Sequence, residues 1–170
     1  MKTSKLIALA GIGYALFQVG KEKYDDFAVG FQDSLDQLKY DIKGISNIKL
    51  KNITFSTGTP KVTFDMDLKI SNPSELDFTA NGGKVINLKK IDVLTLNNDL
   101  LATITPGISQ IELPPNGSTR LDNLPVEIPV SKLGNLVDMF LTGLNVDEDQ
   151  FALRLNVVVA GTQFVINTKE

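Results

Sequence analysis

The spacing of hydrophobic positions changes once along this 170-residue chain, at about Gly44. Before that residue, an uncharged apolar run is followed by a run with a helical repeat. After it, hydrophobic and polar residues alternate in short segments separated by turn-forming residues, which is typical of β-strands with one buried face. The pattern predicts an N-terminal helical segment over residues 1–43 and a β-rich domain over residues 44–170.

The helical segment opens with an uncharged stretch from Leu6 to Gly20, flanked by Lys5 and Lys21. As a helix this stretch is about 22 Å long, short of the roughly 30 Å hydrocarbon core unless the flanking lysines extend towards the headgroups. An uncleaved membrane anchor, a cleaved signal peptide and a helix buried in an assembly are the three interpretations, and no small-x-small cleavage site follows the run. The hydrophobic residues of this membrane or packing helix are Leu6, Ile7, Leu9, Ile12, Tyr14, Leu16, Phe17 and Val19.

From Lys21 to Lys43, hydrophobic residues recur at alternating intervals of four and three, with charged residues between them. This is the heptad spacing of an amphipathic helix. The residues of this stripe are Tyr24, Ala28, Phe31, Leu35, Leu38 and Ile42. The stripe packs either on the β-domain or against a partner helix, which includes a second copy of the chain. A glycine at position 30, in the middle of the run, costs about 1 kcal/mol relative to alanine.

In the second part, the clearest strand runs from Pro60 to Ser71, where five hydrophobic residues alternate with polar ones. A strand is also expected before it, near 48–55. Further strand-like runs lie near 76–80, 84–88, 91–96, 100–105, 108–113, 119–130, 151–159 and 162–168. Tight-turn residues separate them, so we expect a mainly β fold, an antiparallel β-sandwich. One short helix is expected at about 131–142, capped by Ser131 and ended by Gly143.

Several of these segments carry a resemblance to a known family. They are Ile70-Ser71-Asn72-Pro73, the Lys90–Leu96 strand, the Asn97-Asn98 hairpin, the Pro114-Pro115-Asn116-Gly117 turn and the Leu121–Val130 strand. Together they resemble the group-two late embryogenesis abundant proteins, which share the water-stress and hypersensitive-response domain. The resemblance covers about residues 44–170 and implies a fibronectin-like β-sandwich with one helix near the end of the chain. It implies no enzymatic activity and no established ligand. The N-terminal segment departs from the family domain, and a small anchored form also resembles proteins of bacteria and their phages.

The composition excludes much chemistry. The chain has no His, Cys or Trp, so disulfides, His/Cys zinc sites, iron–sulfur clusters and His-dependent nucleophiles are impossible. Its formal net charge of −3 is mild, and no region is strongly basic, so nucleic acid is not an expected partner. No cofactor or metal is expected.

Three groups of polar residues are candidate sites. Asp65 and Asp67 lie on one face of a strand, roughly 7 Å apart, within the range of glycosidase carboxylates, although lysines beside them also suit an ordinary wet face. Residues 147–149, Asp-Glu-Asp, are acidic but lack the spacing of a calcium loop. Asn72-Pro73 is interpreted as the end of a strand, because proline cannot donate to a ladder.

These patterns favour a non-catalytic structural or binding module, a β-sandwich displayed on a helical stalk and attached to a membrane through its N-terminus. The cell envelope and a virion membrane both fit, and the side of the membrane is not indicated. The alternatives are a structural component of a phage virion or other large assembly, and a carboxylate-dependent hydrolase. The expected partners are membrane lipid or neighbouring protein helices, with a homo-oligomer through the heptad stripe as one form.

Overall fold

The computed structural model describes residues 33–52, 54, 58–107, 110–142, 146 and 148–167. The chain divides into two compact units, Met1–Leu35 and Asp36–Glu170. Residues 33–36 are helical, and Leu35 is buried. The predicted membrane or packing helix, from Leu6 to Val19, lies outside the described residues, as do Tyr24, Ala28 and Phe31 of the heptad stripe.

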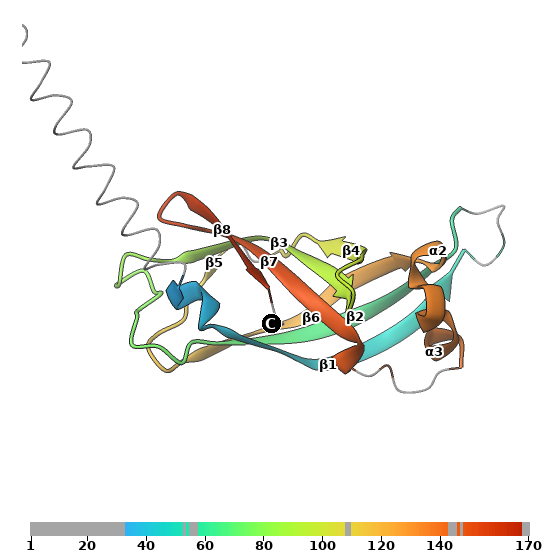
Figure 1. Ribbon diagram of the computed structural model, residues 1–170, viewed down its shortest axis with the longest axis horizontal. Coiled ribbons are helices and arrows are strands. Elements are labelled where there is room, and N and C mark those ends of the chain that lie inside the picture. Colours follow the sequence, from blue (N-terminus) through green and yellow to red (C-terminus); the bar gives the residue numbers. More distant parts are fainter. Residues whose placement is uncertain are drawn as a thin grey trace, which may run out of the picture. The chain divides into compact units, whose positions relative to one another are not determined.

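The second unit is mainly β, and each of its strand pairs is antiparallel (Figure 1). One sheet has the order β1-β2-β6, formed by β1 (Lys39–Lys51), β2 (Lys61–Ser71) and β6 (Ser118–Pro129). The other has the order β4-β3-β7-β8, formed by β3 (Ile86–Thr95), β4 (Leu100–Ile104), β7 (Phe151–Val159) and β8 (Thr162–Asn167), with β5 (Gln110–Ile111) also paired to β3. The predicted antiparallel β-sandwich is confirmed at this level.

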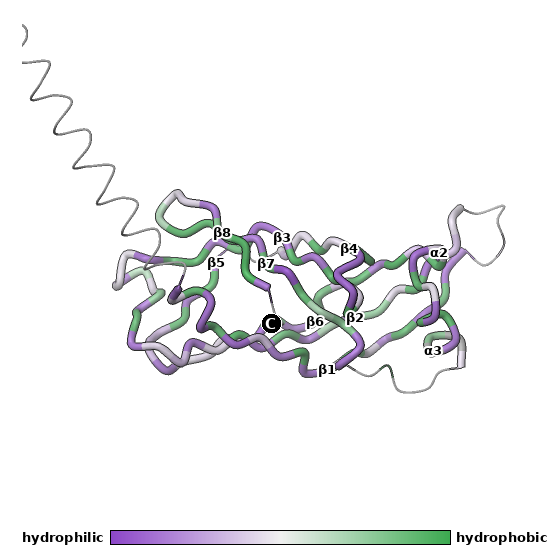
Figure 2. Tube along the Cα trace, viewed as in Figure 1, coloured by the Kyte–Doolittle hydropathy of each residue, from purple (hydrophilic) through white to green (hydrophobic). Residues whose placement is uncertain are grey.

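The core lies between the two sheets. Hydrophobic and hydrophilic positions alternate along the strands (Figure 2), and the hydrophobic side chains of β2 are all buried. Three phenylalanines connect the layers: the Phe64 ring of β2 lies 5.7 Å from Phe140 and 6.2 Å from Phe151 of β7, between ring centroids. Rings at such separations contribute beyond their buried area, so this cluster is a strong contact between the sheets and the helical segment.

Most strand predictions after residue 60 are confirmed. β2, β6, β7 and β8 match the predicted runs within one residue. The runs at 84–88 and 91–96 are one strand, β3, whose pairing with β7 shifts register between Leu88 and Lys90. The run at 76–80 is not a strand: Phe78 makes an isolated bridge to Leu113.

The predicted end of the N-terminal helix was wrong. We expected the helix to continue to Lys43, but β1 begins at Lys39 and pairs with β2 from that residue. Leu38 and Ile42, expected on a helix interface, are buried in the second unit, where Leu38 faces residues of both sheets. The cause is an ambiguity of spacing, because Leu38, Tyr40 and Ile42 also alternate as strand residues do.

The short helix is confirmed in position but not as one element. It consists of α2 (Val130–Leu133), the 3-10 turn η2 (Gly134–Leu136) and α3 (Val137–Leu141). Gly134 has φ +51°, a conformation open to glycine, and it divides α2 from α3. Ser131 lies inside α2 and does not cap it, since the N-cap residue is Pro129. A second 3-10 turn, η3 (Glu148–Gln150), precedes β7.

Within the described part of the chain, no helix combines the length and the apolar character needed to cross a bilayer.

Candidate functional site

The two carboxylates weighed for hydrolysis are held by structural partners on the outer face of β2. Asp65 accepts a hydrogen bond of 2.7 Å from the side chain of Asn47 in β1. Asp67 accepts one of 2.8 Å from the backbone N–H of Asn123 and one of 2.7 Å from the guanidinium of Arg120. The Asn123 and Arg120 hydrogen bonds lower the pKa of Asp67 below its ordinary value. Asp67 is therefore a stabilised anion, which suits an ion pair better than a proton donor.

Asn72 is a buried connector rather than only the end of a strand. Its side-chain nitrogen donates to the carbonyls of Leu76 (2.7 Å), Pro114 (3.1 Å) and Leu113 (3.3 Å). Its side-chain oxygen accepts from the backbone N–H (3.1 Å) and hydroxyl (2.6 Å) of Ser74. One side-chain amide thus joins the loop after β2 to the turn before β6. Its donors and its acceptor are already used within the protein and are not free to bind a ligand.

Asp92 is buried on the outer face of β3. It accepts hydrogen bonds from the Thr103 hydroxyl (2.7 Å), the Lys90 ammonium (3.2 Å) and the Asn156 amide (3.4 Å). Burial raises the pKa of the Asp92 carboxyl, but the Thr103, Lys90 and Asn156 contacts outweigh burial, and the pKa lies below its ordinary value. These partners join β3 to β4 and β7, so the cluster holds the sheet together.

An open site lies at the end of the sandwich, beside the turn that joins β3 to β4. Thr95 shapes this turn: its hydroxyl oxygen accepts from the backbone N–H groups of Asn97 (3.2 Å) and Asp99 (3.1 Å). The backbone N–H of Thr95 donates to the Asp99 carbonyl at 2.9 Å, and Asn98 takes φ +67°. A serine or threonine that bonds to the following backbone favours such a turn, so the loop is locally determined.

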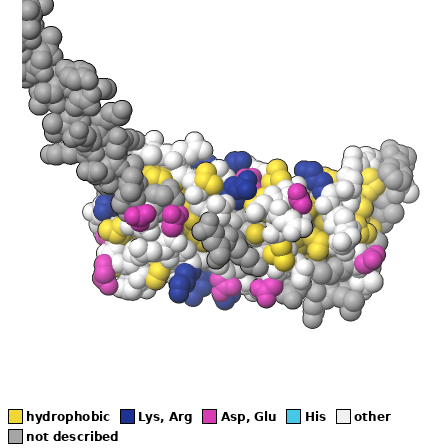
Figure 3. All heavy atoms as spheres, in the orientation of Figure 1, with side chains coloured by type: hydrophobic (Ala, Val, Ile, Leu, Met, Phe, Trp, Pro, Cys, Tyr) yellow, Lys and Arg dark blue, Asp and Glu magenta, His cyan; other side chains and the backbone are white. Residues whose placement is uncertain are grey.

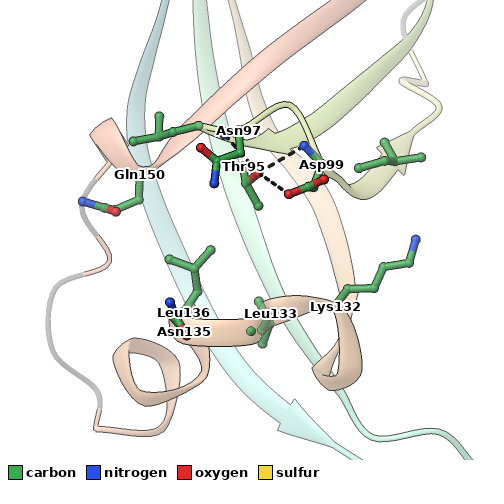
Figure 4. Close-up of a pocket in the computed structure, with 11 residues that line it drawn as sticks. Thr95, Asn97, Asp99, Lys132, Leu133, Asn135, Leu136 and Gln150 are labelled. Atoms are coloured by element: carbon green, nitrogen blue, oxygen red, sulfur yellow. Dashed lines mark hydrogen bonds between the residues drawn. The ribbon is translucent and has the colours of Figure 1, made fainter.

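The opposite side of this site is formed by α2 and η2. The backbone N–H of Val130 donates to the Pro60 carbonyl at 2.9 Å, which fixes the start of α2 beside β2. Leu133 is buried beneath the site, and Gly134 turns the chain so that Asn135 and Leu136 follow along its edge. The turn and the helical segment face each other across the gap (Figure 4).

Between them is a cavity of about 520 Å³, which we call the end cavity. This volume falls within the usual 300–1,000 Å³ of ligand sites. Its lining residues are Thr95, Leu96, Asn97, Asp99, Leu100, Lys132, Leu133, Gly134, Asn135, Leu136 and Gln150. Among the described residues, the lining mixes leucines with amides and carries one cation and one anion, so it suits binding rather than proton transfer.

Among the described residues, the remaining sequence candidates form no site. Asp147 lies outside the described residues, and Asp149 is in η3. No group of three or more acidic side chains suited to a metal ion occurs among the residues that are described. The two adjacent lysines of β3 also form no basic patch, since Lys89 is exposed at the β3 irregularity and Lys90 is paired with Asp92. On the face seen in Figure 3, basic and acidic side chains are interspersed with hydrophobic ones.

Sequence reasoning missed the end cavity. Its two sides come from segments more than thirty residues apart, and the resemblance used Asn97 only as part of a hairpin. One signal was available: Leu96 and Leu100 flank a polar turn, where hydrophobic residues gain little from folding. Such residues are a reason to look for a contact surface.

Comparisons with known proteins show no family. No family model matches the sequence, and no curated protein is similar to it. Among solved structures, the chain is similar to a protein from Archaeoglobus fulgidus, with 11% identity, a TM-score of 0.29, and 75% of this chain and 94% of that chain covered. It is also similar to an uncharacterized β-sandwich protein from Clostridium difficile 630, with 15% identity, a TM-score of 0.25, and 79% and 87% covered. These likenesses give no indication of activity.

Proposed function

We propose that this chain is a non-catalytic β-sandwich, tethered to a membrane through its N-terminal segment, that serves as a structural or binding module. The observation that supports a non-catalytic role is that the candidate carboxylates serve as structural hydrogen-bond acceptors. Asp65, Asp67 and Asp92 each accept hydrogen bonds from neighbouring strands of the sandwich. A hydrolytic pair needs one carboxyl that stays protonated near neutral pH, and the lowered pKa of Asp67 does not suit that role.

The finer relationship we propose is to the group-two late embryogenesis abundant proteins, whose domain is a fibronectin-like sandwich. The support is the run of segments around Asn72-Pro73 and the hairpin at Asn97-Asn98. A buried Asn72 that joins two loops gives a physical reason for a strand to end on that dipeptide. Membrane attachment is supported by the uncharged run from Leu6 to Gly20 with its flanking lysines.

The tether is tested by fractionating bacterial cells that express the full chain. We expect the chain in the membrane pellet after a high-salt wash and its release by detergent. A Leu9→Lys, Ile12→Lys variant should move to the soluble fraction, because two charges in the apolar run oppose insertion. An Ile48→Lys, Leu50→Lys variant is the matched control, since it adds the same charges to exposed side chains of β1. The full chain in the soluble fraction would contradict the tether.

Assembly through the heptad stripe is the second candidate. With Leu35, Leu38 and Ile42 buried, the stripe is reduced to Tyr24, Ala28 and Phe31. Coiled coils need about three or four heptads, so this shorter stripe favours tethering over self-association. Light scattering of the detergent-solubilised chain tests the point: a defined oligomer that dissociates in a Phe31→Asp variant would favour the assembly role instead.

A further inference from the structure

We propose that the end cavity binds a short, uncharged, extended peptide segment through its backbone and one or two apolar side chains. The inference rests on the proposed function, since it names the ligand class of the binding module.

The first argument is the exposure of hydrophobic side chains. Leu96 is 51% exposed and Leu100 is 47% exposed, the highest values among the large hydrophobic residues noted as exposed in the described chain. Both lie on the same side of the end cavity. Leu133 and Leu136 line the other side, so an apolar group placed between the two sides would contact leucines on both. Apolar side chains gathered at a concave site mark a binding surface, whereas scattered ones do not.

The second argument is the free polar capacity. Within the described part of the chain, the side chains of Asn97, Asn135 and Gln150 have no hydrogen-bond partner, unlike Asn72 and Asn156 elsewhere in the sandwich. A side-chain amide offers donors and an acceptor together, which matches the N–H and C=O of a peptide unit. Three such amides around one cavity therefore suit a peptide backbone, whatever its sequence.

The third argument is charge and shape. Lys132 and Asp99 give the lining one charge of each sign, so a neutral ligand is favoured over an ionic one. No aromatic side chain lines the cavity among the residues that the structure describes, so this lining lacks the flat face on which a ring ligand would stack. An extended peptide needs neither a counter-charge nor a stacking face.

The experiment is a titration of the full chain in lipid nanodiscs with capped tetrapeptides that carry Leu, Val, Phe or Ala at alternate positions. The readout is the methyl NMR signals of the leucines. We expect saturable shifts at Leu96 and Leu100. Binding should weaken at least tenfold in Leu96→Asp and measurably in Asn135→Ala. Capped peptides with Asp in place of the apolar residue should not bind.

Val165→Asp is the matched control, because Val165 is 43% exposed on β8, outside the lining of the end cavity. It should bind as the unchanged chain does. No saturable shift with any peptide, equal loss in Val165→Asp, or saturation by maltose in place of peptide would each overturn the proposal. Membrane fractionation of the Leu96→Asp chain separates the two hypotheses: a chain that stays in the pellet but binds no peptide refutes the ligand class and leaves the tether intact.

Discussion

The side-chain amide of Asn72 donates a hydrogen bond of 3.1 Å to the carbonyl oxygen of Pro114, 42 residues further along the chain. The same side chain also reaches Leu76 and Ser74, so it closes the loop after β2 and the turn before β6 at one point. Removing a buried amide whose donors and acceptor are all used is costly. Its former partners are left without a hydrogen bond in a place where water does not replace it.

Asn72→Ala should lower the free energy of unfolding by about 2–4 kcal/mol, because one buried and two partly buried carbonyl contacts lose their donor. Urea unfolding followed by circular dichroism measures this difference. Asn97→Ala is the control: its side chain is exposed and makes no hydrogen bond within the described chain, so a change below about 0.5 kcal/mol is expected. Equal effects of the two substitutions would show that Asn72 does not connect the loops.

Replacing Tyr40 should raise the free energy of unfolding, whereas replacing Asn72 should lower it. Its hydroxyl is buried, and it has no hydrogen-bond partner in the described residues. Tyr40→Phe should therefore raise the free energy of unfolding by about 1 kcal/mol at neutral pH. An unchanged or lower stability would mean that the hydroxyl finds a partner in solution.

The same residue predicts an alkaline effect. Burial and then the charge of Asp36 raise the pKa of Tyr40 well above its ordinary value. The folded state thus favours the neutral phenol, and this contribution is complete below the unfolded pKa of about 10 and is lost as pH rises above it. Urea unfolding at pH 7 and pH 11 should show a smaller loss of stability in Tyr40→Phe than in the unchanged chain.

Asp92 predicts how the stability of the fold changes at acid pH. Its pKa is lowered in the folded state, so its contribution is present above the unfolded value of about 3.9 and is lost as pH falls through the folded value. Asp92→Asn should be less stable than the unchanged chain at pH 7, by about 1–2 kcal/mol, and the difference should shrink at pH 3. Asp99→Asn, at the exposed turn, removes one carboxylate without opening this cluster. A pH-independent difference for Asp92→Asn would rule out the linkage.

Phe140 tests whether the helical segment is part of the core. Its ring lies 5.7 Å from Phe64 and 6.4 Å from Phe151, between centroids. Phe140→Ala should cost about 3–4 kcal/mol, because it leaves a cavity between β2, β7 and α3. Leu96→Ala, at an exposed leucine, should cost far less in the same denaturant series. A small loss in Phe140→Ala would mean that α3 detaches readily from the sheets.

The sequence was most informative where one face of a strand is wet. β2 alternates without a break from Lys61 to Ser71, and its predicted bounds agree with the structure. The prediction of secondary structure was wrong where a helical and a strand period coincide. Leu38 and Ile42 fit the spacing of a heptad repeat and also the alternation of a strand. It also divided β3, because consecutive lysines at 89 and 90 interrupt the alternation at an irregularity in the ladder.

The roles of side chains were harder to predict than the strands. Asn72 was interpreted only through its neighbour proline, since its partners Leu113 and Pro114 are more than forty residues away. The end cavity was missed for the same reason, because Leu96 and Leu133 line one cavity only after both sheets have formed. Contacts between distant segments depend on the tertiary fold, and no local period reports them.

The position of β1 has a mechanical consequence. The second unit begins just before an outer strand, which among the described strands pairs only with β2, starting at Lys39 opposite Ser71. A force applied through Leu38 would act first on the pair Lys39–Ser71 and then on each following pair. The strand would therefore separate from β2 one pair at a time, and not along its whole length at once. Tension from the N-terminal side would therefore release β1 at low force, with the opposite sheet still intact.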